Sequence, residues 1–149
     1  MYHSIVKSII KRNFDALTDG NFDVLLQTVA DDVDHTFLGH SAIGGQRKSK
    51  EKLRLWFERL FRLFPNLSFT VQNIIVTGFP WHTRIAAEWE AEVTPKSGTP
   101  YTNTGVHMIT LKWGKAVKIK AYENAELVAN ACNTMLDNGI KEAGAEQIT

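Results

Sequence analysis

Three extended runs joined by two turns are the feature of this sequence that most constrains its fold. The first turn runs from Pro95 to Pro100 and holds a glycine between its two prolines, and the second is Gly114-Lys115. Turn-forming residues of this kind mark the ends of strands, and short connections join strands that pair antiparallel. We therefore predict a three-stranded antiparallel meander, with strands at His82–Thr94, Tyr101–Trp113 and Ala116–Asn124.

Helical periodicities precede this meander. An apolar stripe predicts a first helix, and Asp19-Gly20-Asn21 stops it before a short second helix. Ser49 can cap a third helix, which Pro65-Asn66 would end. The inward positions of the three helices are Ile5, Ile9, Ile10, Phe14 and Leu17, then Leu25, Leu26 and Val29, then Leu53, Trp56, Phe57, Leu60, Phe61 and Phe64.

The remaining segments complete a succession of helices followed by strands. We expect strands at Val33–Leu38 and Leu67–Thr77, with a glycine-rich loop at Gly39–Gly45 and a turn at Gly78-Phe79-Pro80. A last helix is expected at Glu126–Leu136, followed by a frayed or loosely packed tail to Thr149. This order argues for an α+β fold with a mainly antiparallel sheet whose curved face the helices cover, leaving a pocket.

Composition sets the broad class. The 149 residues are 44% hydrophobic and 22% charged, which is ordinary for one globular domain spanning residues 1–149. A net charge of +1 gives no general attraction to nucleic acid or to an anionic membrane. With no apolar run near the roughly 20 residues of a membrane span, no signal-peptide pattern and one cysteine, we expect a soluble cytoplasmic protein.

Metal and cofactor signatures are not found in the sequence. The five histidines are scattered, and Cys132 has no ligand at metal-binding spacing. Gly44 and Gly45 lack the Lys-Ser/Thr pair that completes a phosphate-binding loop. We therefore expect no metal, no cofactor, and no nucleic-acid or membrane partner.

Four short motifs resemble those of the cone-shaped α+β superfamily that includes nuclear transport factor 2, ketosteroid isomerase and the SnoaL-like polyketide cyclases. The resemblance extends from about residue 5 to residue 130. It implies a cone-shaped, curved, mainly antiparallel sheet with helices packed on its concave face, the cystatin-like α+β barrel. The motifs are Asp19-Gly20-Asn21-Phe22-Asp23, Ala30-Asp31-Asp32-Val33, Trp81-His82-Thr83-Arg84, and Trp113-Gly114-Lys115 with Ala121-Tyr122-Glu123-Asn124.

The functional positions of ketosteroid isomerases are not matched here. Their helical tyrosine, general-base aspartate and protonated aspartate correspond by the resemblance to Asn13, Thr36 and Val106. These departures argue against steroid isomerisation. SnoaL-like members often end the last strand with an aspartate, and here that place holds Asn124, preceded by Glu123.

Glu123 and His35 are the candidate catalytic residues. Strand alternation puts Glu123 on one face with Ile119 and Ala121, and burial there would raise its pKa into the range useful for acid–base chemistry. His35 lies beside the position that the resemblance gives to the base, and a histidine exchanges protons near neutral pH. The alternatives are a solvated glutamate at a strand end and a structural histidine.

Candidate ligand-binding residues are mostly aromatic. Phe14, Trp56, Phe57 and Trp89 would line a pocket for a flat or apolar molecule, although such residues also fill cores. Polar contacts at the rim would come from Tyr101, Asn103 and Asn124, and the isomerase analogy turns Met108, with Val106, inward.

The same analogy leaves an apolar outer face on the sheet, made of His107, Ile109, Leu111 and Trp113. Large apolar patches usually mark interfaces, so we expect a homodimer packed through this face. The overall expectation is a small-molecule-binding protein that acts, without a cofactor, as an isomerase, cyclase or hydrolase on an apolar or aromatic substrate. The alternative is a non-catalytic dimeric ligand-binding protein or protein-interaction scaffold.

Overall fold

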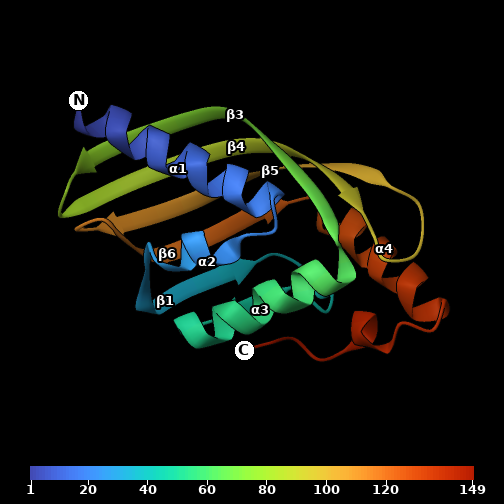
Figure 1. Ribbon diagram of the computed structural model, residues 1–149. Coiled ribbons are helices and arrows are strands. Elements are labelled where there is room, and N and C mark those ends of the chain that lie inside the picture. The colour runs from blue at the N-terminus through green and yellow to red at the C-terminus, as the bar shows by residue number, and fades with distance from the viewer.

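A computed structural model of residues 1–149 shows a curved six-stranded sheet with helices against its concave side (Figure 1). The helices are α1 (Tyr2–Thr18), α2 (Phe22–Leu26), α3 (Lys50–Leu63) and α4 (Ala125–Asp137), and a short 3-10 helix spans Lys141–Gly144. The strands are β1 (Val29–Phe37), β2 (Gly45–Arg47), β3 (Asn66–Phe79), β4 (His82–Thr94), β5 (Tyr101–Lys112) and β6 (Lys115–Glu123).

The strand order across the sheet is β2-β1-β6-β5-β4-β3. All neighbours are antiparallel except β1 and β6, which pair in parallel. Strands β2 and β3 are the two edges of the sheet, so the curved sheet does not close into a barrel. The predicted α+β class with a mainly antiparallel, cone-like sheet is confirmed, and so is the predicted meander β4-β5-β6, whose ends fall within one residue of the expected ones.

The sheet departs from the sequence-based prediction at its β1 edge. The expected strand at Val33–Leu38 starts earlier, because residues 30–32 also belong to β1, where a bulge between Val29 and Asp34 interrupts the pairing with β6. Part of the expected glycine-rich loop forms β2, which pairs with residues 35–37 of β1. The predicted turn at Gly78-Phe79-Pro80 was placed too early, because β3 continues through Phe79.

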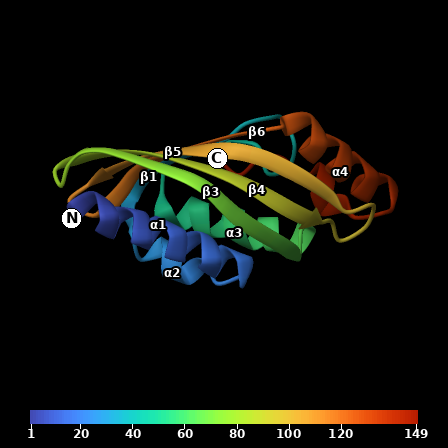
Figure 2. The same cartoon turned by 90° about the horizontal axis from the view of Figure 1, so that it is seen from above.

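Helices α1 and α3 cover the concave face (Figure 2). Each follows from an apolar stripe at helical spacing: α1 buries Val6, Ile10, Phe14 and Leu17, and α3 buries Leu53, Trp56, Phe57 and Leu60. The predicted cap of α3 is confirmed, since the Ser49 side chain accepts a hydrogen bond from the Lys52 amide at 3.1 Å. No helix is long and apolar enough to cross a membrane.

The C-terminal tail is attached to the β1–α3 connection, and the expectation of a frayed tail was wrong. Gln147 donates hydrogen bonds to the carbonyl oxygens of Gly39 (3.1 Å) and Ser41 (3.3 Å). Arg59 donates to Glu146 O at 2.7 Å, and Arg47 donates to Ile148 O at 2.9 Å. These hydrogen bonds run from side chains to the backbone and need no apolar pattern in the tail. The sequence therefore gives no sign of the attachment.

Replacing Gln147 by alanine is expected to lower the free energy of unfolding by about 1–2 kcal/mol, because two backbone carbonyls lose their donor. Urea unfolding measures the change. The matched control is Gln72→Ala, since the exposed Gln72 makes one long contact, at 3.4 Å, with Glu90. Equal stabilities of the two variants would contradict a structural role for the tail.

Candidate functional site

A cavity of about 190 Å³ lies between the concave face of the sheet and helices α1 and α3. Of its 32 lining residues, 26 are hydrophobic, so the removal of an apolar molecule from water into this cavity would be favourable. The polar side chains in the lining are Asn13, Thr28, His35, Asn103 and His107.

The predicted aromatic residues Phe14, Trp56, Phe57 and Trp89 all line this cavity. Trp56 and Phe57 pack edge to face, with ring centroids 5.0 Å apart at 72°, and Phe57 also stacks on Phe22 at 8°. Tyr101 and Asn103, predicted at the rim, also line the cavity.

Strand β5 presents the opposite face to the one that the isomerase analogy indicated. Its buried and cavity-lining positions are Asn103, His107, Ile109 and Leu111. Met108 therefore lies on the outer face, in a separate shallow depression, and its predicted inward orientation, with that of Val106, was wrong. The sequence does not show which set of alternate β5 side chains faces the helices, because apolar residues occupy both sets.

This reversal also removes the apolar outer face from which a dimer was predicted. The outer face carries Arg84 and Glu88 on β4 and Lys118 on β6, so it is largely charged. A homodimer through this face stays a prediction, without the apolar patch that motivated it.

His35 is held by a buried arginine. Arg47, only 1% exposed, places Nη1 2.6 Å from His35 Nδ1. Its other donors reach Gly44 O at 2.8 Å and Ile148 O at 2.9 Å. Because arginine carries only donors, His35 Nδ1 must accept, and the ring hydrogen of the neutral imidazole lies on Nε2. Burial, then the charge of Arg47, holds the pKa of His35 well below its usual range.

His107 is held in the same tautomer by a tryptophan. Trp89 Nε1 donates to His107 Nδ1 at 2.7 Å, and an indole nitrogen can only donate. The His107 hydrogen is therefore also on Nε2. Burial lowers the pKa of His107 to about 4, so this ring is neutral at physiological pH as well.

The two histidines thus present the same chemistry to one cavity. They lie two strands apart, His35 opposite Ile119 and His107 opposite Ala121 on the intervening strand β6. Neither Nε2 has a hydrogen-bond partner in the protein. With Nδ1 occupied in each ring, the Nε2 hydrogen is the one left to donate, which makes His35 less suited to the predicted role of a base.

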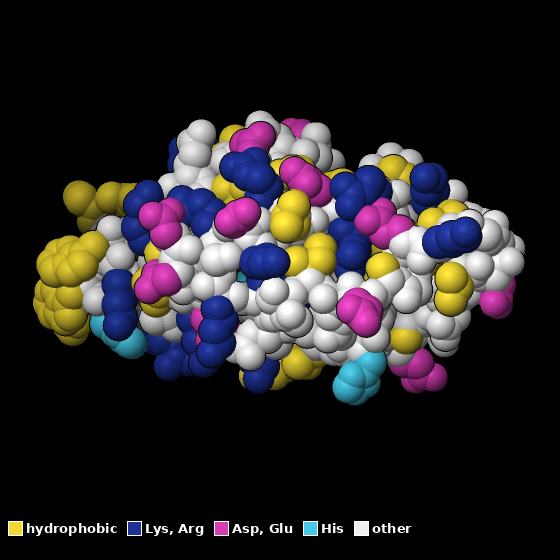
Figure 3. All heavy atoms as spheres, turned by 90° about the horizontal axis from the view of Figure 1, so that it is seen from below, with side chains coloured by type: hydrophobic (Ala, Val, Ile, Leu, Met, Phe, Trp, Pro, Cys, Tyr) yellow, Lys and Arg dark blue, Asp and Glu magenta, His cyan; other side chains and the backbone are white.

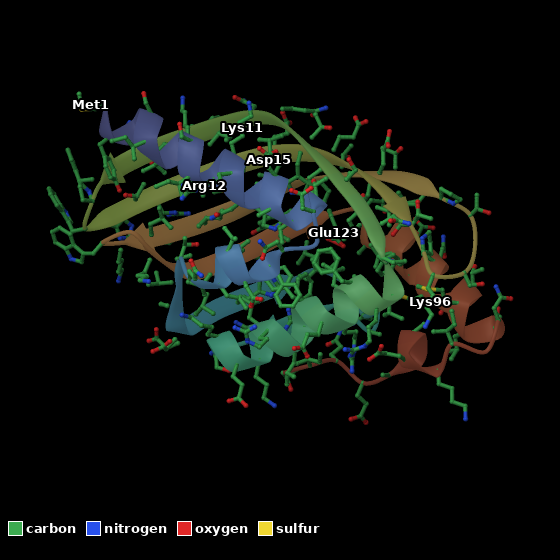
Figure 4. The ribbon with its side chains drawn as sticks, in the orientation of Figure 1. Met1, Lys11, Arg12, Asp15, Lys96 and Glu123 are labelled. Atoms are coloured by element: carbon green, nitrogen blue, oxygen red, sulfur yellow. The ribbon has the colours of Figure 1, made fainter.

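Glu123 lies on the concave side at the end of β6 (Figure 4). Its cross-strand partner is Gly105, and the absence of a side chain there lets the Trp89 ring approach. Both carboxylate oxygens are buried, and no other residue donates a hydrogen bond to them. Burial raises the pKa of Glu123 to about 7.

Glu123 is next to the cavity but is not part of its lining. Tyr101, which does line the cavity, has its pKa raised first by burial, then by the charges of Cys132 and Glu123. Asn103 Oδ1 accepts from the Asn124 amide at 3.2 Å, which ties the wall of the cavity to the end of β6. Asn124 itself caps α4, its Oδ1 accepting from the Glu126 amide, and it does not line the cavity.

Three functional features escaped sequence reasoning. Arg47 lies in a run of polar and basic residues, Gln46-Arg47-Lys48, that would ordinarily be exposed. His107 was placed on the outer face. Asn13 has a buried Oδ1 without a partner in the cavity wall, and the resemblance had named it only as a departure from the isomerase tyrosine. No group of three or more His, Cys, Asp or Glu side chains is positioned to hold a metal ion.

Comparison with solved structures shows that the chain has the cone-shaped NTF2-like fold. An NTF2-like protein of unknown function from Burkholderia pseudomallei aligns with a TM-score of 0.75 at 16% identity, covering 84% of this chain and 95% of that one. TerC, co-crystallised with polyporic acid, aligns with a TM-score of 0.72 at 18% identity, covering 83% and 95%. A protein proposed to be a SnoaL-like polyketide cyclase, from a Jannaschia species, gives 0.65 at 22% identity, covering 83% and 88%.

Within this class, the profile of the SnoaL-like domain matches residues 10–119. The chain belongs to the SnoaL-like domain family. A comparison with curated protein sequences found no match.

Proposed function

We propose that this protein binds an apolar, oxygen-bearing small molecule in its cavity and transfers a proton on it without a cofactor, with Glu123 as the acid–base group. The observation that carries the proposal is the buried Glu123 carboxyl, to which no other residue donates a hydrogen bond. Buried polar groups are nearly always satisfied, so a ligand or a bound water is the natural partner. A pKa of about 7 lets this group take up and release a proton near neutrality.

The cavity limits the size of the ligand. Its volume of about 190 Å³ exceeds that of an apolar cavity of about 150 Å³, which holds benzene. One or two rings therefore fit. The family, and a similar structure co-crystallised with polyporic acid, support a small-molecule ligand.

The two histidines indicate what else the ligand carries. A carbonyl oxygen accepts hydrogen bonds, and the Nε2 hydrogens of His35 and His107 are fixed donors in an apolar surrounding. If Glu123 takes a proton from the carbon beside the carbonyl, the electron pair moves to the oxygen, where such donors stabilise the negative charge. Return of the proton from Glu123 to a different carbon of a conjugated enolate gives isomerisation. Attack of the carbanion on a second carbonyl of the same molecule gives cyclisation, and the proton on Glu123 passes to the alkoxide that forms.

Deuterium exchange into a bicyclic ketone tests the proposal without knowledge of the natural substrate. 1-Tetralone in heavy water should exchange its α-hydrogens faster with the wild-type protein than with buffer, and the rate should rise with pH through about 7. In Glu123→Gln the acceleration should fall on the order of a hundredfold. NMR or mass spectrometry gives the rate.

Glu126→Gln is the matched control, because Glu126 is exposed and only three residues away. Tryptophan fluorescence, measured in parallel, reports binding of the ketone in each variant. Exchange that is unchanged in Glu123→Gln would refute the assignment of Glu123.

A ligand-binding protein without catalysis is the second candidate. The observation in its favour is that the Glu123 carboxyl does not itself line the cavity. Binding of the ketone with no accelerated exchange, in both wild type and Glu123→Gln, would favour it.

A further inference from the structure

Three large aromatic side chains are exposed together at one end of the molecule. Phe79, Trp81 and Trp113 are 62%, 55% and 72% exposed. Phe79 and Trp81 stack with ring centroids 5.0 Å apart at 11°, and Trp81 and Trp113 are 6.3 Å apart. We call these three residues the aromatic tip. Figure 3 shows hydrophobic side chains gathered at that end, on the left.

The fold does not require aromatic residues at these positions. Trp113 has a φ of +52°, in the left-handed region where asparagine or glycine is the usual choice for a hairpin turn. Its amide donates to Pro80 O at 2.7 Å, which joins the β5–β6 turn to the β3–β4 turn. A bulky side chain in a disfavoured backbone conformation, with most of its surface in water, argues for a role outside the folded core.

Basic side chains adjoin the aromatic tip. A depression of about 320 Å³ on the outer face of the sheet is lined by His82, Arg84, Lys118 and Lys120, with Met108, Thr110 and Tyr122, and no acidic residue lines it. His82 pairs across the hairpin with Phe79, so the depression begins at the tip. On the neighbouring strands, Asp34 of β1 accepts from the Gln46 amide, and Glu88 lies further along β4 than Arg84.

The cavity reaches the surface at the same end. Its lining includes Gly114, beside Trp113, and Ile5, which is 53% exposed. The start of α1 is fixed there by His3, whose ring nitrogen bonds Gly78 O at 2.8 Å, and by Tyr2, whose hydroxyl bonds Thr83 Oγ1 at 2.6 Å. An apolar ligand would thus enter beside the aromatic tip.

We propose that the aromatic tip and the adjoining basic depression dock the protein on an anionic lipid surface. Tryptophan favours the boundary between water and membrane, and neighbouring Lys and Arg side chains add attraction to anionic headgroups. Composition did not reveal this surface, because the net charge of +1 averages it with acidic residues elsewhere.

A second copy of the chain fits the tip less well than a membrane does. Placing two tips together would bring the basic groups Arg84 and Lys118 of each copy close to those of the other, which is repulsive. Three side chains on two turns also present far less than the roughly 800 Å² per partner of a stable protein interface. The connection between docking and ligand uptake rests on the proposed function, but the docking itself does not.

Co-sedimentation with vesicles tests the proposal. The wild-type protein should bind vesicles of phosphatidylcholine with added phosphatidylserine, bind pure phosphatidylcholine more weakly, and lose binding as salt rises. The double variant Trp81→Ser/Trp113→Asn should lose at least about tenfold in affinity for the vesicles. Asparagine suits the backbone at position 113, so this variant should keep its fold by circular dichroism.

Leu136→Gln is the matched control, because Leu136 is 43% exposed on α4, away from the tip, and its loss should leave vesicle binding unchanged. Lys118→Gln should weaken binding only to vesicles that contain phosphatidylserine. No binding of the wild type to either vesicle would overturn the proposal. So would sedimentation velocity showing a wild-type dimer that the tip variant abolishes, since the tip would then be a contact between copies.

Discussion

Replacing Arg47 by alanine is expected to lower the free energy of unfolding by about 3 kcal/mol. Arg47 is almost fully buried and donates to His35, Gly44 O and Ile148 O. Its removal leaves three buried acceptors without a donor, and each such loss costs about 1–3 kcal/mol. Burial lowers the pKa of Arg47 to about 10, which shows that burying its charge is unfavourable. The variant no longer has this cost, which offsets part of the loss of the three hydrogen bonds. Urea unfolding measures the difference.

A second measurement separates the role of Arg47 in the site from its role in stability. In the wild type, nitrogen-15 NMR should show His35 with its hydrogen on Nε2 alone. In Arg47→Ala, Nδ1 loses its donor, so the tautomers should mix and the pKa of His35 should rise from its lowered position. Burial, the larger cause of the lowered pKa, remains. His107, held by Trp89, should not change.

Arg62→Ala is the control for this experiment. Arg62 forms an exposed ion pair with Glu142 at 2.7 Å, and such pairs contribute about 0.5 kcal/mol. If Arg47→Ala cost no more than Arg62→Ala and left the His35 tautomer unchanged, the structural account of the His35 site would be wrong.

The meander and the helices could be predicted from the sequence because each rests on local periodicity. In β4, Ile85, Ala87 and Trp89 alternate with Arg84 and Glu88, and the buried face follows directly. The same reasoning failed in β5, where Val106 and Met108 compete with Ile109 and Leu111 for the inner face. In such a strand only the neighbouring strands and helices decide the phase.

The candidate site was predictable only in part, because its polar members depend on contacts between distant segments. Glu123 was identified from alternation along β6. Arg47 is buried by a tail about 100 residues further along the chain, through bonds to the backbone that leave no sequence pattern. The tautomers of His35 and His107 depend on partners, Arg47 and Trp89, that pairing across strands brings close. Local sequence pattern therefore predicted the helices and the meander, and contacts between distant segments determined the hydrogen bonding of the polar side chains in the site.

Glu123→Gln is expected to stabilise the protein at alkaline pH and to have little effect in acid. The folded state raises the pKa of Glu123 from its ordinary 4.5 to about 7. Below about pH 4.5 the carboxyl is protonated in both states and adds no pH-dependent cost. Between about pH 4.5 and 7 the unfolded chain releases this proton while the folded protein keeps it, so wild-type stability falls across this window, and above 7 the folded protein holds a buried charge. The pKa shift sets an upper limit of about 3 kcal/mol on the gain in unfolding free energy of the variant at alkaline pH. Partial solvent access of the carboxyl reduces the expected gain to about 2 kcal/mol.

The difference between wild type and variant isolates this effect. His35 and His107 have lowered pKa values, so they add stability above their ordinary pKa of 6.5 that is lost as pH falls, but this contribution is common to both proteins and cancels. Urea unfolding from pH 4 to 9 should show the curves together in acid and separated above pH 7, with the exposed Glu88→Gln as a control that shows no separation. Parallel curves throughout would place the Glu123 carboxyl in water. A separation of the expected sign would mean that the fold tolerates a destabilising carboxylate beside its cavity, as proteins do where a residue serves function rather than stability.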